Sequence, residues 1–242
     1  MKYSKLNKLN KIIDVVGFDN YRTVQYMADN NIEIDSMGIN ELIYSCNKGL
    51  LEIIPIILKN GIDINTNDGE ALYIAINSKK YRTVKLLIKN GADVNLRNGE
   101  MMKIAVLNKA PKIVKLLLKN NAKINNDAFC YSLHNESIFN ILVKNKKFVI
   151  KYAKNTLEYL FNLMDEDVAK GGDLDNDYVG IIKKLSDNGM NMKNYKINGY
   201  LLCKAVEHNM DCIIEALIDA GADPDADDGQ PLLNAIKNDE YE

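Results

Sequence analysis

The amino-acid sequence predicts an all-α fold in which short helix–turn–helix repeat units stack into a solenoid. The first observation behind this prediction is a dipeptide that recurs at intervals of 30 residues, as Asn30-Asn31, Asn60-Gly61, Asn90-Gly91 and Asn120-Asn121. The second is the segment Tyr21-Arg22-Thr23-Val24, which returns unchanged 60 residues later as Tyr81-Arg82-Thr83-Val84. Because two independent markers keep the same phase, the sequence indicates an internal repeat of 30 residues.

Residues 66–95 give the order of elements within one repeat unit. The turn at residues 67–69 uses Asn, Asp and Gly, which tolerate a left-handed backbone, and the apolar run 71–76 predicts a short first helix. Residues 77–80 break that helix, and the apolar residues between Val84 and Ile88 then lie on one side of a second helix. Gly91 follows as the left-handed residue that ends it. A helix pair this short cannot bury its apolar stripe alone, so neighbouring units must complete the core.

This unit resembles the ankyrin repeat. The residues that carry the resemblance are Gly69, Leu72, Ala75, Val84, Leu86, Leu87 and the segment Gly91-Ala92-Asp93-Val94-Asn95. In the preceding unit, Gly49-Leu50-Leu51-Glu52 stands where the family has a Gly-His-Leu-Glu turn between its helices. Units of this length, in a chain rich in Asn, Lys and Ile, are similar to the ankyrin arrays of giant viruses and of AT-rich bacteria.

Two departures from the family pattern affect the expected fold. The usual ankyrin period is about 33 residues, whereas the period here is 30. The Thr-Pro-Leu-His signature of the family is replaced by Glu70-Ala71-Leu72-Tyr73, Glu100-Met101-Met102-Lys103 and Gln230-Pro231-Leu232-Leu233. We therefore expect an ankyrin-repeat solenoid with short turns in place of full β-hairpin fingers.

Counting from the Asn-Gly marker divides the chain into repeat units that together form a single domain over residues 1–242. The expected units are 5–35, 36–65, 66–95, 96–125, 126–150, 151–193 and 194–225, with a partial unit at 226–242. The first is an N-terminal cap, the fifth is shortened, and the sixth has a longer helix over 155–169 and an acidic insertion over 165–177. The partial unit has only a first helix and leaves an apolar face uncovered. We therefore expect a longer array or end-to-end association.

Composition and charge exclude several classes of protein. The chain is 47% hydrophobic and 26% charged, which is too apolar for disorder. It has no apolar run of the roughly 18 residues that a membrane span needs, and residues 1–10 lack the apolar core of a secretory signal. The four cysteines have no metal-ligand spacing, so we expect reduced thiols and a cytoplasmic location, the host cytoplasm if the protein is viral or a secreted effector. Residues 1–154 carry 24 Lys and Arg against 14 Asp and Glu, whereas residues 155–242 carry 7 against 19.

The sequence has no motif that predicts catalysis, a cofactor or a metal. Residues 173–177 begin like a calcium loop, but Tyr178 and Lys184 stand where the sixth-position glycine and the twelfth-position glutamate belong. Residues 223–227 depart from the pattern at the same two positions. The two histidines, His134 and His208, have no motif-bearing Ser or Cys nearby. We predict that the protein is not an enzyme and that it holds no cofactor and no metal.

A group of lysines raises the alternative of nucleic-acid binding. Lys59, Lys85, Lys89, Lys115 and Lys119 fall at polar positions of second helices, but no aromatic residues for base stacking lie among them. A solvated helix face is the simpler interpretation. We predict neither a nucleic-acid nor a membrane partner.

The remaining prediction is recognition of a partner protein, and it follows from the resemblance. In ankyrin repeats the finger tips and the exposed side of the first helices form a concave binding surface. By register, the corresponding residues are Asn47, Lys48, Asn67, Asp68, Glu70, Tyr73, Asn77, Ser78, Arg97, Glu100, Lys103, Leu107, Asn108, Glu207 and His208. Their types vary between units while the core positions repeat, and exposed Tyr73 and Leu107 are the expected anchors.

The predicted function is therefore a non-catalytic protein–protein interaction scaffold whose partner the sequence does not identify. Three settings stay open. The protein is a viral or bacterial factor that acts on a host protein, an inhibitor that neutralises a toxin, or a recognition module of a longer multidomain protein.

Overall fold

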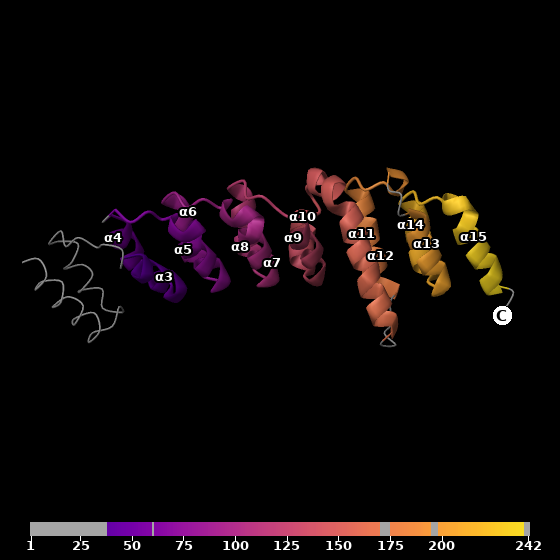
Figure 1. The fold of residues 1–242 in the computed structure, drawn as a ribbon, viewed down its shortest axis with the longest axis horizontal. Coiled ribbons are helices and arrows are strands. Elements are labelled where there is room, and N and C mark those ends of the chain that lie inside the picture. Colours follow the sequence, from indigo (N-terminus) through magenta and orange to yellow (C-terminus); the bar gives the residue numbers. More distant parts are fainter. Residues whose placement is uncertain (1–37, 60, 170–174, 195–197, 240–242) are drawn as a thin grey trace, which may run out of the picture. The chain divides into compact units, whose positions relative to one another are not determined.

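The computed structural model describes residues 38–59, 61–169, 175–194 and 198–239, and every regular element within these ranges is a helix (Figure 1). The prediction of an all-α fold is confirmed. The chain divides into two compact blocks, residues 1–125 and residues 126–242, which we call the N-terminal and C-terminal blocks. The expectation of one domain over the whole chain stays a prediction. The predicted N-terminal cap, residues 5–35, lies outside the described residues.

The described part of the N-terminal block consists of three helix pairs. Helix α3 (Gly38–Lys48) pairs with α4 (Ile53–Lys59), α5 (Thr66–Asn77) with α6 (Tyr81–Lys89), and α7 (Glu100–Leu107) with α8 (Pro111–Lys119). The 3-10 helix η1 (Leu96–Gly99) leads into α7. Among the first helices, α5 contacts both α3 and α7, and among the second helices α6 contacts α8. These pairs correspond to the second, third and fourth predicted repeat units.

The core of this block repeats with the period of the sequence. Leu72 and Ile76 of α5 are fully buried, and 30 residues later Met102 and Val106 of α7 are buried in the same register. In the second helices, the buried positions Thr83, Val84 and Leu87 of α6 correspond to Ile113, Val114 and Leu117 of α8. Each unit therefore presents one apolar stripe from each of its helices, and stacking removes those stripes from water.

The second helices α6 and α8 end as the sequence predicts. Gly91 has a φ of +94°, its N–H donates to the Ile88 carbonyl at 3.1 Å, and the Ala92 N–H donates to the Leu87 carbonyl at 3.1 Å. These two bonds form the hydrogen-bonded cap that a left-handed residue allows after an α-helix. In the next repeat, Asn121 takes the same left-handed conformation, with a φ of +58°.

The turns before the first helices explain how a unit of 30 residues closes. Asn67, Asp68 and Gly69 all have left-handed backbone angles, with φ values of 54°, 54° and 71°. Arg97, Asn98 and Gly99 repeat this run of three left-handed residues. A left-handed backbone is costly for most residues and cheapest for Gly, Asn and Asp, which supply five of these six positions. The predicted replacement of β-hairpin fingers by short turns is confirmed in the part of the chain that the structure describes.

The C-terminal block begins with a compact repeat and continues with a long helix. It contains α9 (Asn126–Tyr131), η2 (Ser132–His134), α10 (Glu136–Leu142), α11 (Lys146–Ala169), α12 (Asp175–Asp187), η3 (Met192–Asn194), α13 (Asn198–Glu207), α14 (Asp211–Asp219) and α15 (Ala226–Asp239). Helix α9 contacts α11, α12 contacts α14, and α13 contacts both α14 and α15. Phe129 of α9 stacks on Tyr152 of α11, with ring centroids 5.8 Å apart.

The expected start of the long helix at Asn155 is wrong, because α11 begins at Lys146. Val149 and Ala153 are fully buried and extend the apolar stripe that continues through Leu157. The Asn145 side chain accepts a hydrogen bond from the Lys147 N–H at 3.1 Å, as a residue that starts a helix does. The expected boundary between repeat units at residue 150 consequently falls inside α11.

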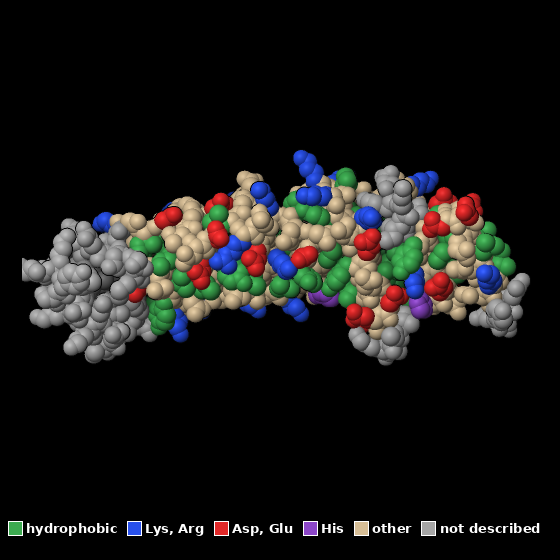
Figure 2. Space-filling model, in the orientation of Figure 1, with side chains coloured by type: hydrophobic (Ala, Val, Ile, Leu, Met, Phe, Trp, Pro, Cys, Tyr) green, Lys and Arg blue, Asp and Glu red, His purple; other side chains and the backbone are tan. Residues whose placement is uncertain are grey.

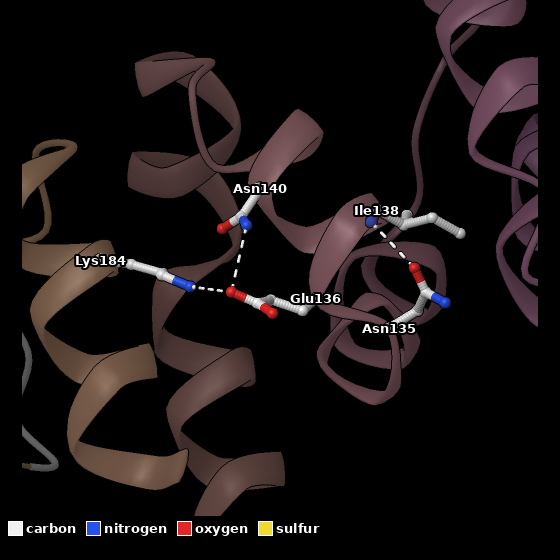
Figure 3. Close-up of polar contacts among 5 residues, drawn as sticks. All are labelled: Asn135, Glu136, Ile138, Asn140 and Lys184. Carbon is white, nitrogen blue, oxygen red and sulfur yellow. Dashed lines mark hydrogen bonds and ion pairs between the residues drawn. The ribbon is translucent and has the colours of Figure 1, made fainter. Parts of the chain in front are cut away.

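Helix α10 is fixed at its first turn by polar contacts (Figure 3). The Asn135 side chain accepts from the Ile138 N–H at 3.0 Å and so caps the helix. The Glu136 carboxylate accepts from Lys184 Nζ of α12 at 3.0 Å and from Asn140 Nδ2 at 3.4 Å. The Lys184 ammonium and the Asn140 amide lower the pKa of Glu136. Since Glu136 is exposed, this ion pair between α10 and α12 contributes little to stability.

Candidate partner-binding surface

The predicted contact residues of the N-terminal block lie on the exposed side of α3, α5 and α7, on the turn at the start of α5 and on η1, which precedes α7. We call this surface the first-helix face. Its thirteen predicted members are Asn47, Lys48, Asn67, Asp68, Glu70, Tyr73, Asn77, Ser78, Arg97, Glu100, Lys103, Leu107 and Asn108. All of them are exposed or half-buried.

Four of these residues link neighbouring repeats at the ends of the first helices. Ser78 Oγ donates to Asn47 Oδ1 at 2.6 Å. One repeat further on, Asn108 Nδ2 donates to the carbonyl and to the side-chain oxygen of Asn77, at 3.2 Å and 3.3 Å. The polar groups that the sequence assigned to a partner therefore already bind each other, and they hold α3, α5 and α7 in register.

A second group is held by Arg97. Its guanidinium donates to the carbonyls of Asp68 and Asn67, both at 3.1 Å, and lies 4.6 Å from the centre of the Tyr73 ring. Asn67 Nδ2 also donates to Glu70 Oε2 at 3.2 Å. Tyr73 is half-buried beneath this cation and is not the fully exposed anchor that the sequence predicted. Arg97 ties one turn to the next, so these turns belong to the scaffold.

The side chains that remain accessible on this face include large apolar groups. Leu107 is 48% exposed, as predicted, and Glu100 of the same helix is exposed. The sequence interpretation missed Tyr44, which is 36% exposed on α3, with Lys48 Nζ 5.7 Å from the ring centre. The register gives no signal for Tyr44, because Tyr73 corresponds to its neighbour Ile43, which lies 30 residues earlier.

The two predicted residues of the C-terminal block lie at the end of α13. Glu207 pairs with Lys204 Nζ at 3.6 Å, and His208 Nε2 lies 3.7 Å from Asp165 Oδ1 of α11. Tyr200, at the first turn of the same helix, is 50% exposed and was missed by the sequence interpretation. The exposed side of α13 thus resembles that of the first helices in the N-terminal block, with a mixture of charged and aromatic side chains.

A ladder of exit asparagines is the other feature that sequence reasoning missed. Asn65 Nδ2 donates to the Gly91 carbonyl at 3.2 Å, and Asn65 Oδ1 accepts from the Asp93 N–H at 2.9 Å. Asn95 repeats both bonds one unit later, to the Asn121 carbonyl at 3.3 Å and from the Lys123 N–H at 2.7 Å. Each asparagine thereby satisfies a donor and an acceptor of the next repeat. The signal for this role was present, since Asn65 and Asn95 lie one period apart.

Comparison with known families agrees with this repeat geometry. The sequence matches the family described as ankyrin repeats (3 copies) over residues 12–98 and again over residues 42–128. The chain is an ankyrin repeat protein. Ankyrin repeats generally mediate protein–protein interactions and are typically not enzymes, so a protein partner is implied. A search of curated protein sequences finds no match.

The described part of the ankyrin chain shows no site for a metal ion. Across the described ranges, no cluster of three or more His, Cys, Asp or Glu side chains has the geometry to hold a metal ion. The first acidic segment with calcium-like spacing, 173–177, has side chains outside the described residues. In the second, Asp223 Oδ1 accepts from the Asp225 N–H at 3.0 Å. None of the described helices is long and apolar enough to cross a lipid bilayer.

Burial makes three of the four cysteines of this ankyrin protein poor nucleophiles. All four thiols are free. Burial raises the pKa of Cys46 from 9.0 to about 12, and burial also raises the pKa of Cys130 and of Cys203. Because the thiolate is the reactive form, these environments oppose nucleophilic chemistry.

Proposed function

We propose that this ankyrin repeat protein is a non-catalytic recognition module that binds a partner protein through the first-helix face of its N-terminal block. The observation that carries the proposal is the exposure of Tyr44 and Leu107 on that face, amid polar side chains that are fixed to one another. Buried aromatic anchors such as tyrosine supply much of the energy of protein interfaces, and burial of an apolar side chain such as leucine adds to it. A rigid surface loses little conformational entropy on binding.

The arrangement of the face supports this function. Ser78 and Asn108 lock the ends of the helices, and Arg97 locks the turns, so the anchors are presented on a surface that needs little ordering. The exposed residues differ from repeat to repeat, whereas the buried ones repeat in type. Four free thiols fit a reducing compartment, and we place the protein in the cytoplasm, either of its own cell or of a host.

The test compares two matched triple variants in affinity capture from candidate host lysates. The first carries Tyr44→Ala, Lys103→Ala and Leu107→Ala on the first-helix face. The control carries Glu52→Ala, Lys59→Ala and Lys123→Ala, three exposed positions away from that face. We expect the first variant to lose the partner that the wild type and the control both retain, with unchanged circular dichroism. If the first variant keeps every partner of the wild type, the assignment of the face is wrong.

A further inference from the structure

The outer sides of α6 and α8 carry six cations in repeat register. Arg82, Lys85 and Lys89 of α6 are exposed, and Lys112, Lys115 and Lys119 occupy the same positions 30 residues later on α8. We call these six residues the cationic face. Spacings of three and seven residues place the three cations of each helix on one side, and α6 contacts α8. Packed helices lie about 8–10 Å apart, so the two rows form one patch.

No acidic side chain interrupts the cationic face. Neither α6 nor α8 contains an Asp or a Glu. Among the residues that the structure describes, none of the six cations has an ion-pair partner. Lys85 and Lys89 also face each other four residues apart, as do Lys115 and Lys119, and like charges at that spacing destabilise a helix. Lys89 and Lys119 lie in the last turns of their helices, where the helix dipole favours a cation, but the dipole gives no such reason for Arg82, Lys85, Lys112 and Lys115.

Helix α14 shows that the scaffold does not require cations at these positions. The left-handed glycines Gly91 and Gly221 that end α6 and α14 set the two helices in register. In that register Glu215 stands at the position of Lys85 and Asp219 at the position of Lys89. Ile213 and Leu217 of α14 are buried at the positions that Thr83 and Leu87 occupy in α6. The same helix is thus built with the opposite charge on its outer side.

The exposed carboxylates of α14, namely Asp211, Glu215 and Asp219, form an anionic face. They recur every four residues and so lie along one side of the helix. Further exposed carboxylates follow before α15, at Asp223 and Asp225, and in its first turn, at Asp227 and Asp228. Figure 2 shows acidic side chains gathered over this region. One chain therefore carries a cationic patch and an anionic patch on equivalent helices.

We propose that the cationic face of one copy of this protein binds the anionic face of a second copy. The two faces are complementary in charge, because three carboxylates in a row on α14 match a row of cations on α6 or α8. Neither set is neutralised among the described residues of its own chain. This surface lies on the second helices and is separate from the first-helix face, so self-association leaves the proposed recognition surface accessible.

Two other anionic partners fit the cationic face less well. Proteins that bind single-stranded nucleic acid without sequence preference combine cations with several aromatic platforms, whereas Tyr81 is the one aromatic residue in α6 and α8. Proteins that lie on an anionic membrane place apolar side chains beside their cations. In α6 and α8, Val84, Leu87, Val114 and Leu117 are instead buried inside the block.

The test measures self-association of the full chain by sedimentation velocity. The wild type is compared at low salt and at about 1 M NaCl, where the Debye length falls to about 3 Å. We expect the average mass at low salt to rise above the 27.3 kDa of the monomer as concentration increases, and to return to it at high salt. A wild type that stays monomeric at low salt overturns the proposal, as does association that salt does not weaken.

Charge reversal identifies the two faces. One variant carries Lys85→Glu, Lys89→Glu, Lys115→Glu and Lys119→Glu, and the other carries Glu215→Lys and Asp219→Lys. Each variant alone should be monomeric, because its two faces then carry like charge, while an equimolar mixture should associate at low salt. Circular dichroism checks that both variants fold. If the mixture stays monomeric, the proposal is wrong. The proposal is also wrong if the cationic face binds single-stranded DNA or phosphatidylserine vesicles while the wild type remains monomeric.

Discussion

Replacing Asn95 by alanine tests whether the exit-asparagine ladder holds neighbouring repeats together. The substitution removes two hydrogen bonds to the next repeat, the one from Asn95 Nδ2 to the Asn121 carbonyl at 3.3 Å and the one from the Lys123 N–H to Asn95 Oδ1 at 2.7 Å. The backbone bond from the Asn95 N–H to Asp93 Oδ1 is kept, because it does not use the Asn95 side chain. The local turn should therefore persist while the link between repeats is lost.

The magnitude follows from these two bonds. A typical hydrogen bond contributes about 0.5–1.5 kcal/mol net, so two bonds set a range of about 1–3 kcal/mol. Both bonds lie at exposed positions where water can replace the lost partner, and the 3.3 Å bond is long, so the lower half of the range applies. We expect Asn95→Ala to lower the free energy of unfolding by about 1–2 kcal/mol.

Urea unfolding of the full chain, followed by far-ultraviolet circular dichroism at constant m-value, measures this loss. Asn95→Asp is the matched variant, since it keeps the acceptor for Lys123 and removes the donor to Asn121, and it should fall between wild type and Asn95→Ala. Lys89→Ala, an exposed change on a second helix, is the control. A loss below about 0.5 kcal/mol for Asn95→Ala, the range of ordinary surface substitutions, would refute the role of the ladder.

Three further predictions test the turns and the thiols. Gly99→Ala should destabilise the protein more than Gly91→Ala, although both glycines have a left-handed backbone. A Cβ added at Gly99 meets the Lys123 carbonyl at 3.3 Å, whereas nothing lies within 4 Å of one added at Gly91. Thermal melts of the two variants measure the difference. Lys79 has a φ of +55°, a left-handed conformation that glycine adopts at lower cost. Lys79→Gly should therefore raise the free energy of unfolding, measured in urea, by about 0.5–1 kcal/mol, whereas Lys79→Ala should leave it unchanged. A thiol reagent at pH 8 should label exposed Cys212 rapidly and Cys46 only in urea, because Cys46 is buried and its pKa is raised to about 12. Mass spectrometry detects the label, and rapid labelling of Cys46 without urea would contradict its burial.

Local signals in the sequence were sufficient to predict the repeat and the turns and helix ends within it. Gly91 and the Asn-Asp-Gly turn at residues 67–69 adopt the left-handed conformations that their residue types predict, because those preferences depend on the residue's own backbone sterics. The start of α11 was placed too late because the Asn/Gly marker is weaker in this repeat, where Asn145 precedes a lysine. The apolar stripe from Val149 onward was the better guide.

The accessible surface was harder to predict than the core, because it depends on which polar side chains pair across repeats. Register placed Tyr73 on the right side of α5, but the stacking of Arg97 from the next turn decides that its ring is half-buried. Asn47 and Asn77 were correctly placed at the ends of helices, yet their bonds to Ser78 and Asn108 cross from one unit to another. A sequence pattern gives a residue's position in its own repeat and not the geometry of the neighbouring one.

The shortened turn affects both the scaffold and the proposed recognition surface. A run of three left-handed residues such as Asn67–Gly69 leaves no room for a paired hairpin to join neighbouring repeats. Polar side chains supply those links instead, through Arg97 on the turns and through Asn65 and Asn95 at the exits. Residues committed to such links cannot also be varied freely to suit a partner. Under the proposed function, the variation that suits a partner falls on exposed helix positions such as Leu107, which is 48% exposed.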